Sequence, residues 1–349
     1  MVENFSIGFF GDLTTGENYQ IKSEINERIN VLRQYGYDWL FEKVDCLLTR
    51  FDMNVANLET PLTCAVKSPL LHKKTVLHWA DPVIVPKILE KHKINAVSLG
   101  NNHCMDYDTK GLTDTIEALK NFGISSFGAG LNIDSASLPL VKNLLLKNKK
   151  INIYIIGGYK YRTNYDEDFK FYAAENKSGV FLLTDKTADA VIKSIKTSDK
   201  DAYIVMFPHF GFDLLKTTQL QIDYAHSFID SGADLVIGHG PHMINSVEKY
   251  KDKIILYGIG NFIFPANFSG KTLPYNMAAE LEFSSAEDER NPKIRVYPTY
   301  MDNQSSKPQT RPIKDSELGS FLNLLLEGAE DLRKSINIDV VDGLIRIGL

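Results

Sequence analysis

The chain has 349 residues, of which 44% are hydrophobic and 24% are charged. This ordinary globular composition excludes a disordered chain, a collagen-like repeat and a coiled coil. The net charge is −5 and the densest basic run, at 147–150, is four residues long, so we expect no nucleic-acid partner.

The sequence also bears on membrane insertion and on the cellular compartment. Its longest apolar stretches fall far short of the roughly 20 residues that cross a bilayer, which predicts no transmembrane segment. The N-terminus has no basic region and enters an apolar run at once, so it predicts a core strand rather than a signal peptide. Cys46, Cys64 and Cys104 show no motif spacing, and we expect reduced thiols in a cytoplasmic protein.

Short apolar runs alternate with helical patterns along the chain. The apolar runs predict strands at residues 5–10, 53–56, 96–99, 151–156, 203–207, 235–237 and 254–257. The helical patterns cover residues 21–32, 38–50, 83–92, 109–122, 185–195 and 217–231. This alternation is typical of a largely parallel sheet with helices on both faces.

Two places depart from the alternation and predict antiparallel hairpins. Residues 140–146 would pair with 151–156, and residues 278–283 with 293–297 across a charged turn at 286–290. These hairpins favour an α/β sandwich of two sheets. Residues 303–312 predict a polar loop and 316–336 a closing helix. We therefore expect a single domain over 1–349, with a core at about 5–300 and a helical closing segment at 313–349.

Polar side chains follow six of the predicted strands at the point where each strand ends. Because the carboxyl ends of parallel strands share one sheet edge, where ligands bind, we expect these side chains to converge. They comprise carboxylates, amides and imidazoles, which suit Mn, Fe or Zn, and no lysine or arginine. The pattern predicts a divalent metal site formed by a set that includes Asp12, Asn57, Glu59, Asn101, Asn102, His103, His209, His239, His242 and Asn261.

Each of these residues has an ordinary structural interpretation when it is taken alone. Asp12 could cap the next helix, Glu59 could be a helix-entry carboxylate and Asn102 could be a turn residue. A lone histidine is more often a buried, hydrogen-bonded side chain than a ligand. It is the joint placement at one sheet edge that favours the metal site. Four other histidines lack a strand-end glycine and are interpreted as structural or exposed: His72, His78, His92 and His226.

Six motifs occur in a fixed order along the chain: GFFGD, NVANLETPLT, VSLGNNHCMDY, VMFPHFG, GADLVIGHGPHMI and LYGIGNFIF. In order and spacing they resemble the CapA family of poly-γ-glutamate capsule biosynthesis, which is similar to calcineurin-like metallophosphatases. The resemblance covers residues 7–264, roughly three quarters of the chain. It implies an α/β fold, a metallophosphatase-like α/β/β/α sandwich with mixed sheets, and one or two divalent metal ions.

The resemblance further implies six metal ligands divided between two ions, with Glu59 bridging them. The other ligands would be Asp12 and His242 for the first ion, and Asn102, His209 and His239 for the second.

Four more site residues follow from the same resemblance. His103 would be catalytic and would protonate the leaving oxygen, as a histidine can near neutral pH. Asp106 would orient the His103 ring. Asn57 and Asn261 would contact substrate or hold the ligand loops.

The chain departs from the family's pattern in its metal ligands. No histidine stands two residues after Asp12, the bridging carboxylate is Glu59 rather than an aspartate, and Gly240 occupies a position where a second histidine is frequent. The first ion is therefore expected to have only Asp12, Glu59 and His242 as protein ligands.

These features favour a metal-dependent, phosphoesterase-like hydrolase related to capsule or surface-polymer biosynthesis. Metal-activated water attacks phosphorus or a carbonyl carbon alike, so an amidase acting on glutamyl amides stays open. A non-catalytic accessory protein of a polymer-synthesis complex is the alternative from a different class. The expected partners are a small-molecule or polymer-derived substrate and capsule- or polymer-synthesis enzymes.

Overall fold

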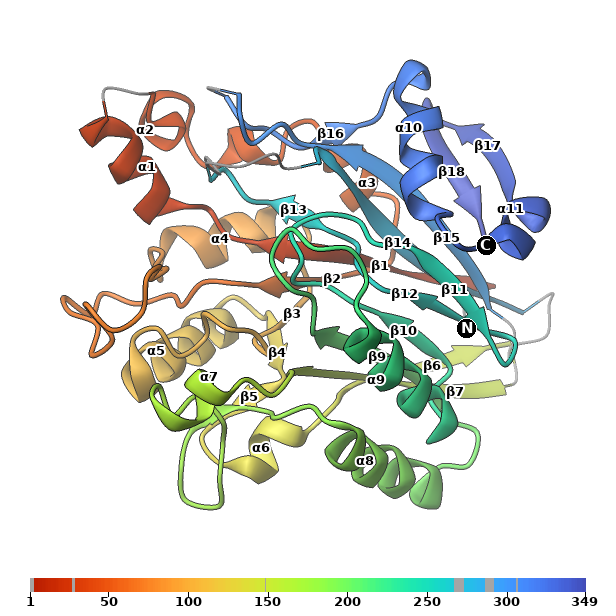
Figure 1. The fold of residues 1–349 in the computed structure, drawn as a ribbon, viewed down its shortest axis with the longest axis horizontal. Coiled ribbons are helices and arrows are strands. Elements are labelled where there is room, and N and C mark those ends of the chain that lie inside the picture. Colours follow the sequence, from red (N-terminus) through yellow and green to blue (C-terminus); the bar gives the residue numbers. More distant parts are fainter. Residues whose placement is uncertain (1–2, 27–28, 148, 267–272, 286–291, 306) are drawn as a thin grey trace.

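The computed structural model describes residues 3–26, 29–147, 149–266, 273–285, 292–305 and 307–349, and its strands form two large sheets (Figure 1). The larger sheet has the order β17-β18-β15-β14-β1-β2-β3-β4, with β13 paired to β1 and β16 to β15. Its strands are β1 (Asn4–Leu13), β2 (Met53–Leu58), β3 (Ala96–Ser98), β4 (Ser125–Phe127), β13 (Asn261–Ile263), β14 (Tyr275–Ser284), β15 (Lys293–Tyr300), β16 (Arg311–Pro312), β17 (Asn337–Val341) and β18 (Leu344–Gly348).

The smaller sheet has the order β11-β12-β10-β9-β7-β6. Strands β7, β9, β10 and β12 are parallel, while β6 and β11 lie antiparallel at the two edges. Its strands are β6 (Leu140–Leu146), β7 (Lys149–Tyr159), β9 (Tyr203–His209), β10 (Leu235–Ile237), β11 (Val247–Tyr250) and β12 (Lys253–Leu256). A separate short pair joins β5 (Ala129–Gly130) to β8 (Gly179–Val180).

The two large sheets pack face to face through a shared apolar core. Phe9 of β1 contacts Phe207 of β9, with ring centroids 5.6 Å apart. Alternate residues of each strand enter this layer because side chains of a strand point to opposite faces in turn. Thus Ile7 from the larger sheet and Val205 from the smaller one lie in the same cluster.

Helices cover the outer face of each sheet and complete an α/β/β/α sandwich with mixed sheets, as predicted. The larger sheet packs against α3 (Asp45–Leu48), α4 (Ile84–Lys91) and α5 (Asp108–Asn121). The smaller sheet packs against α6 (Ile133–Ser137), α8 (Asp185–Ser198) and α9 (Gln219–Asp230). The remaining helical segments are α1 (Glu17–Ile25), α2 (Val31–Tyr35), η1 (Asp38–Leu40), α7 (Thr163–Glu167), α10 (Asp315–Leu325) and α11 (Glu330–Ser335).

The predicted elements largely match these elements. The seven predicted strands correspond to β1, β2, β3, β7, β9, β10 and β12, and both hairpins are present as β6–β7 and β14–β15. The charged turn predicted at 286–290 lies outside the described residues. Three predicted helices are divided in the structure: 21–32 gives α1 and α2, 38–50 gives η1 and α3, and 316–336 gives α10 and α11.

The C-terminal segment differs from the expected helical closure. After α11 the chain forms the β17–β18 hairpin, which extends the larger sheet through β15. The turn is Asp342-Gly343, in which both residues have positive φ, of 53° and 76°; such a pair favours a tight hairpin. In Figure 1 this hairpin and helices α10 and α11, all in blue, gather at one corner of the molecule.

Two further expectations concern a loop and the membrane. The stretch 303–312, expected as a polar loop, buries Asn303, whose amide donates to the carbonyls of Phe264 and Ala266 at 2.9 and 2.7 Å. Within the described ranges, no helix has both the length and the apolar character needed to cross a bilayer.

The three cysteines are all free thiols, and only Cys104 is buried.

Candidate metal centre

A one-residue irregularity in β1 directs Asp12 into the layer between the sheets. The pairing of β1 with β2 runs Phe10 to Ala56 and then Asp12 to Asn57, so Gly11 is an extra residue. An extra residue of this kind bends a strand and changes which face the following side chain meets. Only glycine fits here, because a Cβ on residue 11 would lie 1.8 Å from the Gly260 carbonyl oxygen.

The smaller sheet supplies two histidines by simple alternation. Tyr203, Val205 and Phe207 of β9 face the inter-sheet core, so His209 at the end of that strand faces the same side. His239 follows β10 in the same way, and the Nδ1 atoms of His209 and His239 lie 3.0 Å apart.

Asp12 is the carboxylate on which three imidazoles converge. Its Oδ1 lies 3.2 Å from His239 Nδ1 and 3.7 Å from His209 Nδ1, and its Oδ2 lies 3.3 Å from His242 Nδ1. Asn57 donates to Oδ1 at 2.9 Å. Burial alone would raise the pKa of Asp12, but the hydrogen bonds to His239 and His242 hold it well below its usual range.

Glu59 is buried at the centre of the site without a hydrogen-bond partner for either carboxylate oxygen among the described residues. Its Oε1 lies 3.9 Å from Nε2 of each of three histidines, His103, His209 and His242. Burial, and then the nearby charge of Asp12, raises the pKa of Glu59 well above its usual range. An acceptor surrounded by ring nitrogens but bonded to none is the arrangement that a cation between them would complete.

His242 stands in a left-handed backbone conformation, with φ of 58°, which turns its ring toward both carboxylates. Burial disfavours its charged form, but the charges of Glu59 and Asp12 outweigh burial and raise its pKa to about 10. Asn261 also helps to orient the ring, because its Oδ1 lies 2.9 Å from His242 Nδ1.

Three asparagines surround the site in different ways. Asn57 bonds to Asp12 and accepts a hydrogen bond from Asn101 at 3.0 Å, so it and Asn261 hold site residues in place. The sequence also suggested substrate contact for these two residues. Asn102 lines the adjoining cavity, and its Oδ1 is buried with no hydrogen-bond partner among the described residues. Asn102 therefore retains a free ligand atom, whereas Asn57 and Asn261 use theirs within the protein.

The His103 ring lies against the carboxylate of Asp106. Its Nδ1 lies 2.6 Å from Asp106 Oδ2, while its Nε2 faces Glu59. A buried ammonium completes the group: Lys74 pairs with Asp106 Oδ1 and donates to the Asn102 carbonyl at 2.5 Å. Burial, and then the charge of Lys74, holds the pKa of His103 well below its usual range.

Two residues of this group were not foreseen from the sequence. His78, interpreted as structural or exposed, is fully buried and stacks on His103 with ring centroids 3.5 Å apart. Its Nδ1 lies 2.6 Å from the Glu59 carbonyl oxygen and its Nε2 lies 2.9 Å from the Tyr19 hydroxyl. Lys74 and His78 both belong to the irregular stretch between β2 and α4, where no periodic pattern marks them.

The site opens into a cavity of about 510 Å³. Its wall carries His103, Asn102 and His242, and it also carries cationic side chains, in contrast to the strand ends themselves. The cations are Lys73, Lys74 and Arg162, and the acidic group is Asp213. The strand-end residues contain no lysine or arginine, as the sequence analysis states, and the cations of the cavity come from loops that the strand-end pattern does not include.

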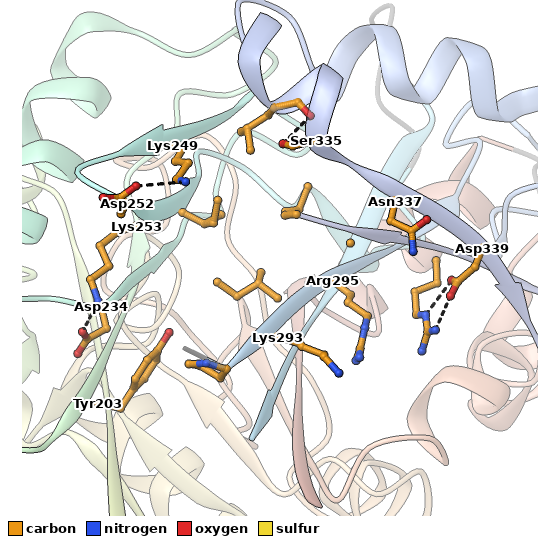
Figure 2. A pocket seen from close by; sticks show the side chains of 17 residues that line it. Tyr203, Asp234, Lys249, Asp252, Lys253, Lys293, Arg295, Ser335, Asn337 and Asp339 are labelled. Atoms are coloured by element: carbon orange, nitrogen blue, oxygen red, sulfur yellow. Dashed lines mark hydrogen bonds and ion pairs between the residues drawn. The ribbon is translucent and has the colours of Figure 1, made fainter. Parts of the chain in front are cut away.

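A second cavity, of about 670 Å³, lies away from these residues between β15, β18 and the β11–β12 hairpin. Figure 2 shows that several of its charged side chains pair with one another, among them Lys253 with Asp234 at 2.8 Å and Lys249 with Asp252 at 3.2 Å. It contains none of the predicted site residues.

The ligand atoms present fit one or two divalent cations. Asp12 forms one group with His209 and His239 and another with Glu59 and His242, and the ligand atoms of each group lie within 4.8 Å of one another. A buried acceptor left unpaired costs roughly 1–3 kcal/mol and more when it is charged, and a cation removes that penalty at Glu59. Imidazole and carboxylate donors suit first-row transition metals.

The structure explains why position 240 holds a glycine and not the second histidine that is frequent in the family. Gly240 has φ of 105°, and a Cβ there would lie 3.0 Å from His209 Nε2. A histidine at position 240 would therefore strain the backbone and press on His209, so a fourth ligand at this position would require a different loop.

Comparison with known proteins agrees with the sequence motifs. The model of the family described as "Bacterial capsule synthesis protein PGA_cap" matches residues 6–266. The capsule biosynthesis protein CapA of Bacillus anthracis is 27% identical over 270 residues, covering 75% of this chain and 60% of that protein. The PGA biosynthesis protein CapA of Bacillus subtilis is 27% identical, and the match covers 74% of this chain and 63% of that protein. A probable polyglutamine synthesis accessory protein of Mycobacterium tuberculosis is 29% identical, covering 68% and 63%.

Two solved structures are similar at low identity. GAP50 of Plasmodium, the anchor in the inner membrane complex, is 10% identical, with a TM-score of 0.38, and the match covers 93% of this chain and 95% of that one. A purple acid phosphatase of yellow lupin is 8% identical, with a TM-score of 0.35, and the match covers 91% of this chain and 55% of that one. The matches to the two CapA proteins span only about three fifths of their lengths. Because the family model covers more than half of this chain, the protein belongs to the bacterial capsule synthesis family PGA_cap.

Proposed function

We propose that this protein is a metal-dependent, phosphoesterase-like hydrolase related to capsule or surface-polymer biosynthesis. The observation that carries the proposal is Glu59, a buried carboxylate. Its oxygens have no hydrogen-bond partner in the described part of the chain, while three imidazole nitrogens lie 3.9 Å from one of them. A purely structural carboxylate in such a place would be hydrogen-bonded.

In this proposal Asp12, Glu59 and His242 would hold one divalent ion. Asn102, His209 and His239 would hold a second, and Asp12 also lies within ligand distance of the last two. Mn, Fe or Zn suits these donors. When bound, such ions lower the pKa of a water molecule and neutralise charge that develops on the substrate.

His103 is the proposed proton donor to the leaving group. With Nδ1 bound to Asp106, the ring can exchange protons with a substrate only through Nε2, the atom that faces Glu59. Lys74 and the backbone N–H of His78 hold the two oxygens of Asp106, so the orientation of the imidazole is fixed before substrate arrives. Orientation of this kind supports general acid–base catalysis.

Two other functions have specific support. The same residues would serve an amidase acting on glutamyl amides, because the chemistry of attack is shared. A non-catalytic role is favoured by the name of the mycobacterial relative, a probable accessory protein of polyglutamine synthesis; partner enzymes of polymer synthesis would then be the binding targets. A cytoplasmic location stays a prediction from the sequence.

The test compares turnover of three substrates by the full chain loaded with Mn, Fe or Zn: bis(p-nitrophenyl) phosphate, p-nitrophenyl phosphate and γ-glutamyl-p-nitroanilide. We expect ester hydrolysis that chelation abolishes and that His209→Ala reduces at least a hundredfold. His226→Ala is the matched control, because His226 pairs with Glu248 at 3.0 Å on the outer side of the smaller sheet.

Each outcome of this comparison distinguishes the candidates. Hydrolysis of the anilide alone identifies an amidase. No turnover with any metal, together with recovery of a polymer-synthesis enzyme on the immobilised chain, identifies an accessory protein. Undiminished ester hydrolysis after chelation would refute the metal-dependent mechanism.

A further inference from the structure

Arg162 is a cation on the wall of the active-site cavity, and no carboxylate of the described residues forms an ion pair with it. It follows β7 and lines the same cavity as Asn102, His103 and His242. Within the described part of the chain the guanidinium donates a single hydrogen bond, a long one of 3.5 Å to the neutral hydroxyl of Tyr159. Among the described residues no carboxylate lies within ion-pair distance of it.

The guanidinium is nevertheless held in place. Its central carbon lies 5.5 Å from the ring centroid of Tyr165 and 5.9 Å from that of Phe212. The backbone is fixed as well, because the N–H of Arg162 donates to the Tyr172 hydroxyl at 2.9 Å and that hydroxyl donates to the carbonyl of Lys160 at 2.6 Å. Aromatic rings hold this guanidinium in place while most of its N–H groups have no acceptor among the described residues. It can therefore donate hydrogen bonds to a ligand at a small cost in conformational entropy.

The charge balance of the cavity points the same way. Its wall carries three cations, Lys73, Lys74 and Arg162, against one carboxylate, Asp213. Lys74 is committed to Asp106, which leaves Arg162 as the ordered cation available to a ligand. Asp213 is exposed and lies near enough to affect the pKa of Arg162 without pairing with it.

We propose that Arg162 forms an anion-binding subsite that holds a carboxylate or phosphate group of the ligand, separate from the group that is cleaved. A guanidinium fork binds the planar oxygen pairs of both groups with two parallel hydrogen bonds. The subsite selects ligands that carry a second negative charge several bonds away from the metal centre. The inference rests on the proposed function only in placing the ligand in this cavity.

The test measures binding rather than turnover, so it is independent of hydrolysis. Glutarate and methyl phosphate are titrated calorimetrically into the full chain as purified, at constant ionic strength. We expect Arg162→Gln to weaken binding of at least one probe by about tenfold or more, as loss of a charged, two-bond contact does. An effect on glutarate alone identifies a carboxylate site, and one on methyl phosphate alone identifies a phosphate site.

Two further variants separate a specific contact of Arg162 from a general effect of charge. Lys170→Gln removes the same charge from an exposed position of the same connection outside the cavity wall, and we expect no more than about a twofold change, since exposed charges act weakly. Asp213→Asn removes the opposing carboxylate and should tighten binding. Equal effects of Arg162→Gln and Lys170→Gln, or no binding of either probe by the wild type, would overturn the subsite. If Arg162→Gln loses probe binding and the wild-type chain hydrolyses none of the three substrates, the subsite is supported and the hydrolase is refuted.

Discussion

Glu59→Gln is expected to change stability in opposite directions depending on whether metal is present. In the metal-free protein both carboxylate oxygens are buried without hydrogen bonds to the described residues, and burial raises the pKa of this group well above its usual range. At neutral pH the folded state must therefore bind a proton that the unfolded chain has lost, which costs roughly 1–3 kcal/mol at about 1.4 kcal/mol per pH unit, and a neutral amide of the same shape should avoid that cost. With an unfolding entropy of about 2.1 cal/mol/K per residue, this corresponds to a rise of about 1–4 °C in Tm.

With metal the order should reverse. A cation at a hundred times its Kd stabilises the wild type by about 2.7 kcal/mol, whereas the variant lacks the central ligand and should gain little. The assay is thermal unfolding of both proteins with chelator and with a series of Mn or Zn concentrations. A structural carboxylate would behave otherwise: Glu248→Gln is the control, since Glu248 pairs with His226 and the Tyr257 hydroxyl, and it should lose stability in both conditions. If Glu59→Gln lowers Tm in chelator and responds to metal like the wild type, the assignment of Glu59 is wrong.

Two other substitutions test the surroundings of the centre, and a third tests the buried carboxylate of Glu17. Lys74→Met removes the partner of the Asp106 carboxylate that orients His103, so kcat should fall about a hundredfold with metal content unchanged by elemental analysis. Because the ammonium also lowers the pKa of His103, the pH profile of kcat should shift to higher pH. Lys73→Met, on the exposed neighbour, should stay within about twofold. Gly11→Ala places a Cβ 1.8 Å from a backbone oxygen and should cost about 3 kcal/mol in urea unfolding and weaken metal binding, whereas Gly319→Ala, with nothing within 4 Å, should not destabilise. Burial raises the pKa of Glu17 from its ordinary value of 4.5 to about 7, so the folded state binds a proton that the unfolded state has lost and stability falls as pH rises through this interval. Glu17→Gln should remove that decline and be more stable than the wild type by about 3 kcal/mol at pH 8, taking about 1.4 kcal/mol per pH unit; a gain equal at pH 4 and pH 8 would contradict this reasoning.

The strands and their polar ends could be read from the sequence because both depend on local pattern. Apolar runs of the right length mark β1, β9 and β10, and the period of two along a strand places His209 and His239 on the core-facing side. The two histidines come together once β9 and β10 are parallel and adjacent, but their meeting with Asp12 does not follow from the pattern, because β1 belongs to the other sheet. The Asp342-Gly343 turn was a local signal of the same kind that would have predicted the C-terminal hairpin.

The helices near the termini were less predictable because their ends depend on packing. The pattern over residues 38–50 satisfies helical periodicity, yet the chain forms only η1 and α3 there. Short helices gain little from propensity alone and owe their stability to tertiary contacts, so a periodic stretch does not fix where such a helix starts or ends.

By itself, the sequence determined the succession of strands, the two hairpins and the residues that stand at the strand ends, since these are properties of neighbouring residues. Only the tertiary structure decided that the strands divide into two facing sheets, and that Gly11 shifts Asp12 toward the histidines of the opposite sheet. It alone brought Lys74 and Arg162 to the cavity, because their positions depend on contacts between segments far apart in the chain, which no periodicity records.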